Sequence, residues 1–237
     1  KDSPADSIYD TFEEMIFQGS ELGHNILGTK ASIARYDTQR VRRFVDRTYT
    51  TDQMVFSSIG SMSVKSAQSI AERYFAAYPS ASRTFRRTAP APSPAFEKTV
   101  GKHTHQVHCV MGARAYDIND ERRLPLALLV NILGGPSANS RLNVSLREKN
   151  GLSYNIEASY TPYNDCGLAA IYFSSDHSNA DHCRELIDRE LDALRRTKLT
   201  PRQLSMAKRQ FLAQMAISME SNEGYMLGAG KSFLVHD

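Results

Sequence analysis

A proline-rich segment at residues 79–95 divides the chain into two blocks. Four of the nine prolines lie in it, among arginines and small residues and without apolar periodicity. Such sequence forms an extended, semi-rigid spacer rather than a helix or a strand. We therefore place a domain boundary at this Pro/Arg-rich linker, with one block at residues 1–78 and the other at residues 96–237. The linker has only one aromatic side chain that could stack on a base, so it does not favour nucleic-acid binding.

The composition is that of an ordinary globular protein, with 41% apolar and 23% charged residues. It excludes a disordered, collagen-like or coiled-coil chain. The net charge of +3 is spread along the sequence, so we expect no nucleic-acid partner. The longest apolar run, Leu124 to Leu133, has half the length of a membrane span, and we expect none. Three widely spaced cysteines leave one disulfide plus a free thiol open, so they do not determine the compartment of the protein.

Apolar spacing in the first block predicts helices and one short strand. Ser3 and the proline after it are typical of a helix start, and apolar residues at helical spacing continue from Ile8 to Ile16. Further helices are expected from Val41 to Thr48 and after Ser63, with a buried strand from Met54 to Ile59 between them. This order predicts a mixed α/β block.

The second block is expected to alternate strands and helices as well. Its predicted elements are a strand at 98–113, a helix at 124–133, a short helix capped by Ser137, a hairpin of strands at 154–160 and 167–174, and two long helices opened by Ser178 and Thr200. Together the two blocks predict an α+β fold class, with a mixed sheet and helices packed on it.

The residues by themselves contain no catalytic centre. The zinc-binding patterns HExxH and HxxEH are absent, and so is the nucleophile elbow GxSxG. His103, His105 and His108 lie close together without an acidic neighbour, which favours strand histidines over metal ligands. The stretch from Gly224 to Ser232 resembles a phosphate loop but has Tyr225 where that loop needs glycine.

One segment carries a family resemblance. Residues 140–154 read SRLNVSLREKNGLSY, which predicts a helix, a glycine turn and the start of a strand. With Leu133-Gly134-Gly135 before it, this segment resembles the second half of the pitrilysin-like zinc metallopeptidases, or inverzincins. That family includes insulin-degrading enzyme, the mitochondrial processing peptidase and many bacterial zinc proteases. The resemblance implies a bacterial protein and leaves both the cytoplasm and the periplasm open. The loop LGHNILGT at 22–29 and the stretch from Tyr49 to Gly60 are similar to the end of the family's first domain.

The resemblance implies that the chain holds parts of two repeated pitrilysin-like α/β domains. Residues 1–78 would be the C-terminal part of the first, zinc-bearing repeat, and residues 96–237 the N-terminal and central part of the second, inactive repeat. The family's HxxEH helix would lie before Lys1, and its counterpart in the second repeat, Leu124 to Leu128, has no metal ligands. The resemblance therefore implies no cofactor in this chain, zinc in the missing N-terminal part of the parent, and no activity of the chain alone.

The family's Arg/Tyr pair, spaced seven residues apart, corresponds to Arg147 and Tyr154. The resemblance implies that these two residues bind a peptide or unfolded polypeptide substrate by hydrogen bonds to its backbone and help to hold the developing oxyanion. The chain would then be the substrate-clamping, non-zinc-binding portion of a zinc metalloendopeptidase. The alternative is a non-catalytic scaffold or partner subunit of the same family, in which Arg147 and Tyr154 are structural.

A faint internal repeat relates the two ends of the chain. The sequences around Tyr9 and Tyr225 are similar in the placement of their residues. We hypothesise that residues 1–80 fill the place of the missing tail of the second repeat. They would do so within one molecule or by exchange between two, which would form a homodimer. The expected partner is the zinc-bearing repeat of the same or a partner chain.

Overall fold

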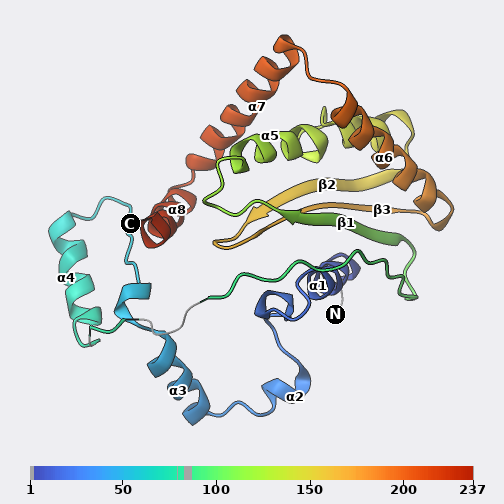
Figure 1. Ribbon diagram of the computed structural model, residues 1–237. Helices are drawn as coiled ribbons and strands as arrows, with labels where there is room; N and C mark the ends of the chain where they lie inside the picture. The colour runs from blue at the N-terminus through green and yellow to red at the C-terminus, as the bar shows by residue number, and fades with distance from the viewer. Residues whose placement is uncertain (1–2, 79, 83–86, 237) are drawn as a thin grey trace. The chain divides into compact units, whose positions relative to one another are not determined.

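The computed structural model describes residues 3–78, 80–82 and 87–236, so part of the expected linker, residues 79 and 83–86, lies outside the described residues (Figure 1). The chain forms two compact units, each discontinuous in sequence. The first contains the residues up to Leu27 together with Thr88–Phe211, and the second contains Gly28–Arg87 together with the residues from Leu212 onward. These units describe packing, whereas the boundary at 79–95 concerns the repeat from which each residue derives and stays a prediction.

A three-stranded antiparallel sheet lies at the centre of the first unit. Its strands β1 (Val107–Ala115), β2 (Ser153–Pro162) and β3 (Gly167–Ser175) have the order β1-β3-β2. The expected α+β class is confirmed, but the described sheet is antiparallel throughout rather than mixed. The reason is local: β2 and β3 form the expected hairpin, whose turn is closed by the bond from the Tyr163 N–H to the Cys166 carbonyl, 2.8 Å.

Helices cover both faces of this sheet, α5 and α6 on one side and α1 on the other (Figure 1). Alternate residues of β3 point to opposite faces, so Ile171 and Phe173 join one hydrophobic cluster, and Leu168 and Ala170 join the other. The helices of this unit are α1 (Pro4–Ile16), α5 (Arg123–Gly134), the π-helix η3 (Asn143–Lys149) and α6 (Ala180–Arg196), with short 3-10 turns η1 (Glu21–Gly23) and η4 (His177–Asn179).

Helix α1 is fixed to the sheet by aromatic packing and one hydrogen bond. Phe12 and Ile16 are buried against β3. The Tyr9 ring stacks on Tyr172 at 5.7 Å between centroids, and its hydroxyl donates to Glu157 Oε1 at 3.1 Å. Burial and the nearby Glu157 carboxylate raise the pKa of Tyr9, so this phenol stays a donor. A segment of the first sequence block therefore packs on the sheet of the second, while the idea that it replaces a missing tail stays a hypothesis.

The second unit consists of helices and irregular segments. Its helices are α2 (Lys30–Ile33), α3 (Thr38–Thr48), the 3-10 turn η2 (Thr51–Gln53), α4 (Val64–Phe75) and α8 (Asn222–His236), and α7 (Pro201–Met219) begins in the first unit and ends in the second. The expected strand from Met54 to Ile59 is wrong, because that segment has no regular secondary structure and pairs with no strand among the described residues. Likewise, only residues from Val107 onward of the strand expected at 98–113 enter the sheet.

The second unit has almost no interior of its own. Among its described residues only Thr50 is buried. Apolar side chains on its helices are exposed, including Val41 and Phe44 on α3 and Ile70 and Phe75 on α4. An amphipathic helix is stable in a protein when its apolar side is covered. The hydrophobic packing that fixes the fold is therefore concentrated in the first unit.

Two phenylalanine substitutions test this division. Phe12→Ala is expected to lower the free energy of opening of β3 by about 3–5 kcal/mol, because it removes a buried ring from a packed cluster. Phe44→Ala removes an exposed ring from α3 and is expected to change that free energy by less than about 0.5 kcal/mol. Native-state hydrogen exchange of the β3 amides measures both. Equal effects of the two substitutions would contradict the division.

Candidate functional site

The two predicted site residues lie at the corner where η3 leads into β2. Arg147 is in the last turn of η3, and Tyr154 is the second residue of β2. Both side chains reach solvent: that of Arg147 is 53% exposed, and Tyr154 is 80% exposed. The helix that carries Arg147 is nonetheless firmly anchored, because Leu142, directly before it, and Leu146, within it, are fully buried in the cluster under α5 and α6. The corner therefore presents both functional groups outward from a packed base.

The helix that carries Arg147 is a π-helix, a rare form that occurs frequently at functional sites. Asn150 donates from Nδ2 to the Ser145 carbonyl at 2.7 Å. The Gly151 N–H donates to the Arg147 carbonyl at 3.0 Å, and the Leu152 N–H to the Leu146 carbonyl at 2.9 Å. These bonds satisfy carbonyls that a helix end leaves without partners. Gly151 can close the turn because it adopts a positive φ of 62°.

Tyr154 occupies a β-bulge in strand β2. Ser153 pairs with Ser175 and Asn155 with Ser174, so two steps along β2 match one step along β3. Tyr154 is thus the extra residue, and a bulge of this kind commonly turns a side chain out of the regular alternation. Ser153 before it and Ile156 after it are both buried. The bulge explains how Tyr154 is exposed without disturbing the core face of the strand.

The Arg147 guanidinium forms only a weak ion pair. Its Nε lies 3.7 Å from Glu148 Oε1, and both side chains are more than half exposed. Exposed pairs of this length contribute little to stability, and water screens them. The Arg147 guanidinium can therefore release the Glu148 carboxylate and bind a hydrogen-bond acceptor of a ligand instead. The structure thus places the expected pair at one corner, but it does not itself show a substrate there.

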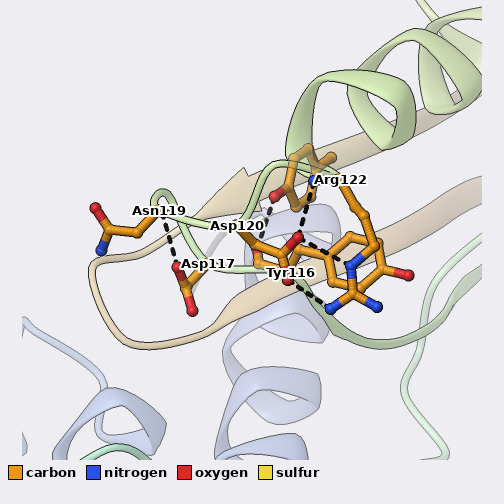
Figure 2. Close-up of polar contacts among 6 residues, drawn as sticks. Tyr116, Asp117, Asn119, Asp120 and Arg122 are labelled. Carbon is orange, nitrogen blue, oxygen red and sulfur yellow. Dashed lines mark hydrogen bonds and ion pairs between the residues drawn. The ribbon is translucent and has the colours of Figure 1, made fainter.

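A polar cluster that the sequence analysis missed lies in the loop between β1 and α5 (Figure 2). Arg122 donates from Nε and Nη2 to the two Asp120 carboxylate oxygens at 2.9 and 2.6 Å, and its guanidinium lies 4.1 Å from the Tyr116 ring centroid. These donors lower the pKa of Asp120. The Tyr160 hydroxyl donates to the Tyr116 carbonyl at 2.6 Å, which ties this loop to β2. The sequence signal that could have predicted this cluster is the spacing of Asp120 and Arg122, two residues apart.

That cluster stabilises the fold rather than forming a site. Tyr160 lies near the end of β2 that leads into the hairpin turn, whereas Tyr154 lies at the beginning of the strand. The loop is further fixed to the turn by the bond from the Ile118 N–H to the Tyr163 carbonyl, 2.9 Å. The Tyr160 and Ile118 bonds link the loop between β1 and α5 to the β2–β3 hairpin, and the Arg122 contacts hold the loop itself together. The cluster therefore holds the far end of the sheet.

The three neighbouring histidines line an open depression of about 540 Å³ together with Asp176. In the part of the chain that the structure describes, no three His, Cys, Asp or Glu side chains are placed to hold a metal ion. His108 Nδ1 lies 2.8 Å from the Tyr172 hydroxyl, and burial lowers the pKa of His108. No disulfide bond joins Cys109, Cys166 and Cys183, so the disulfide left open by the sequence does not form. No described helix has the length and apolar character of a membrane span.

Comparison with known families decides what kind of domain this is. The family model of the peptidase M16 inactive domain matches residues 35–211, three quarters of the chain. The chain belongs to the peptidase M16 inactive-domain family. This confirms the resemblance to pitrilysin-like zinc metallopeptidases and to their inactive repeat.

Relatives of this M16 inactive domain are similar along nearly its whole length. An uncharacterized zinc protease of Bacillus subtilis is 29% identical over 235 residues, which are 99% of this chain and 57% of that protein. An uncharacterized zinc protease of Streptomyces coelicolor is 30% identical over 243 residues, 99% of this chain and 52% of that protein. The chain thus spans about half the length of these curated relatives.

A solved structure shows the same fold. The crystal structure of the peptidase M16 inactive domain from Pseudomonas fluorescens matches 97% of this chain and 55% of that chain with a TM-score of 0.87, at 21% sequence identity. At this identity the match supports the fold and not the function of individual residues. The roles of Arg147 and Tyr154 in the M16 inactive domain therefore stay a proposal.

The turn between the two site residues can be tested on the isolated chain. Gly151→Ala is expected to lower the stability of the first unit by about 1–2 kcal/mol, because alanine is strained at a positive φ. A Cβ at this position would contact nothing within 4 Å, so no steric clash contributes.

Gly101→Ala is the matched control, because its added Cβ also meets nothing and its φ is not positive. Denaturant unfolding of the three proteins measures the difference. A Gly151→Ala protein as stable as the control would show that the left-handed turn is not required.

Proposed function

We propose that this chain is the substrate-clamping, non-zinc-binding portion of a zinc metalloendopeptidase that hydrolyses peptides. The observation that carries the proposal is the coincidence of two backbone irregularities with the two predicted residues. Arg147 lies in a π-helix and Tyr154 in a β-bulge, and such features are concentrated at functional sites. The relatives named as zinc proteases support the parent's class of reaction.

The two side chains have the chemistry needed to hold an extended peptide. A guanidinium offers several N–H donors in a fixed plane and a permanent positive charge, whereas a phenol offers one neutral donor. Peptide carbonyl oxygens accept such bonds, and they accept them more strongly as negative charge develops on them during hydrolysis. Arg147 and Tyr154, seven residues apart on one rigid corner, would thus bind and orient a polypeptide backbone without selecting its side chains.

Zinc does not belong to this chain in the proposal, since no described group of side chains fits it. When bound elsewhere in the parent, zinc would supply a polarised carbonyl and an activated water. The residues that hold it would come from the zinc-bearing repeat, either of the same polypeptide or of a partner chain.

The exposed apolar surface of the second unit supports the proposal that the zinc-bearing repeat is its partner. It buries only Thr50 among its described residues, and its helices expose apolar side chains such as Phe44 and Phe75. The curated relatives are nearly twice as long as the chain. We therefore propose that residues 1–78, as the C-terminal part of the zinc-bearing repeat, are completed by the remainder of that repeat in the parent.

Substitution of the pair in the intact parent tests the clamp. Tyr154→Phe removes one hydroxyl and is expected to lower kcat for peptide hydrolysis about tenfold, and Arg147→Ala about a hundredfold, because each removes a donor to developing negative charge. The zinc content should stay unchanged.

Tyr225→Phe and Arg196→Ala are matched controls, because both residues are exposed in other helices. They should leave kcat unaltered. A parent in which Arg147 and Tyr154 behave like these controls does not use the pair as a clamp. A parent that neither retains zinc nor hydrolyses peptides would instead support the scaffold alternative.

Exposure of the second unit gives a further prediction. In the isolated chain the amides of α3 and α4 are expected to exchange with solvent at least tenfold faster than in the intact parent, because the parent covers their apolar sides. A dye that binds exposed apolar surface should fluoresce less with the intact parent than with the isolated chain. The amides of β3, which lies within a packed core, provide the internal control. Equal exchange of α3 and α4 in the two proteins would exclude the proposed completion.

A further inference from the structure

The bulge that exposes Tyr154 is bridged by a buried hydroxyl. Ser153 is 2% exposed, and its Oγ lies 2.7 Å from the Ser174 carbonyl oxygen and 3.1 Å from the Asn155 carbonyl oxygen. The hydroxyl has a single proton, and the shorter distance indicates that it is donated mainly across the sheet to the Ser174 carbonyl. The hydroxyl spans the irregular step in the ladder, from one strand to the other.

This arrangement adds a side-chain hydrogen bond between the two strands where their pairing is irregular. At a bulge the extra residue leaves the regular pattern of backbone hydrogen bonds interrupted. Ser174 is buried on the opposite strand, and a buried carbonyl without a donor is destabilising. The Ser153 side chain supplies a donor at the point where the backbone pairing between Ser153–Ser175 and Asn155–Ser174 is out of step. Its hydroxyl thus holds the two strands together on either side of Tyr154.

The remainder of β2 has little freedom to change. Ile156 is part of the cluster beneath α5 and α6, and Leu152 packs against the same cluster. A slip of one residue would turn Ile156 to the opposite face of the sheet, which its burial opposes. Loss of the Ser153 hydroxyl would therefore be absorbed within residues 153–155, where Tyr154 is the residue that has no fixed partner on β3.

We propose that Ser153 is a positioning residue, whose hydroxyl holds the bulge and thereby aims the Tyr154 phenol at a bound polypeptide backbone. The inference rests on the proposed function of Tyr154. Ser153 itself is too deeply buried to touch a substrate. Its effect passes through the backbone of the next residue, and that route separates it from a buried serine that contributes only to stability.

A double-substitution experiment in the intact parent separates these roles. Ser153→Ala is expected to lower kcat for peptide hydrolysis about fivefold. In its background Tyr154→Phe should lower kcat by less than a further twofold, because the phenol is already misdirected. In the wild-type background the same substitution should lower kcat about tenfold. Groups that act through one another give such non-additive effects, whereas independent groups give additive ones.

Ser175→Ala is the matched control. Ser175 is directly opposite Ser153 on the same pair of strands, is 1% exposed, and donates its hydroxyl to the Asp176 carbonyl at 3.1 Å, outside the bulge. In a Ser175→Ala background Tyr154→Phe should keep its full effect on kcat. Additive effects of Ser153→Ala and Tyr154→Phe, equal to those obtained with Ser175→Ala, would overturn the positioning role.

Hydrogen exchange of the isolated chain provides a second measurement that does not depend on catalysis. Ser153→Ala should accelerate exchange of the Tyr154 and Asn155 amides at least fivefold, while Ser175→Ala leaves these amides unchanged. Unchanged exchange in Ser153→Ala would refute the bridge itself. If exchange accelerates but Tyr154→Phe alone has no effect on kcat, the bridge stands and the proposed function of Tyr154 fails.

Discussion

The alternation of side chains along β3 organises the whole first unit. Ile171 and Phe173 enter the cluster beneath α5 and α6, whereas Leu168 and Ala170 enter the cluster beneath α1. A central strand that is buried on both faces cannot shift register without exposing one set and burying the wrong one. The positions of β1 and β2 are fixed through their pairing with this strand. The corner that carries the candidate site inherits its rigidity from β3.

At that corner, the exposure of Arg147 and Tyr154 coincides with departures from regular helix and strand geometry. A regular helix followed by a regular strand would satisfy the backbone more simply than a π-helix, a left-handed glycine and a bulge. The irregular elements persist because neighbouring contacts determine them: Leu142 and Leu146 anchor the helix, and the Ser153 hydroxyl bridges the bulge. Local irregularity of this kind is maintained when the surrounding structure is well packed. It allows Arg147 and Tyr154 to be exposed while the residues beside them stay buried.

Much of this architecture follows from local sequence signals. The caps at Ser3 and Ser63 open helices as expected, and Thr200 and Gln203 form a reciprocal capping box before α7. The hairpin follows from alternating apolar residues on either side of a turn. These features depend on contacts within a few residues, which a sequence pattern contains. The site residues, in contrast, were named through a family resemblance, because seven-residue spacing alone has no chemical meaning.

Other features depend on contacts that no local pattern contains. Met54 to Ile59 has the composition of a strand, but a strand also needs a partner. Ser178 has the chemistry of a helix cap, yet it lies inside the turn η4, and Asn179 precedes α6. The π-helix and the bulge at Tyr154 arise from the fit of η3 and β2 to the rest of the unit. The Tyr116–Asp120–Arg122 cluster likewise requires knowledge of where β1 ends relative to the hairpin.

Burial is unevenly distributed between the two units of the chain. The first unit has two packed clusters and contains Arg147 and Tyr154, so the geometry of the candidate clamp depends on contacts that this chain itself supplies. The second unit contributes exposed apolar helices with hardly any interior, and burial of such surface is the main favourable term in association. In the function proposed above, the first unit keeps the binding corner in shape, and the exposed apolar helices of the second unit provide the surface through which the zinc-bearing repeat is joined.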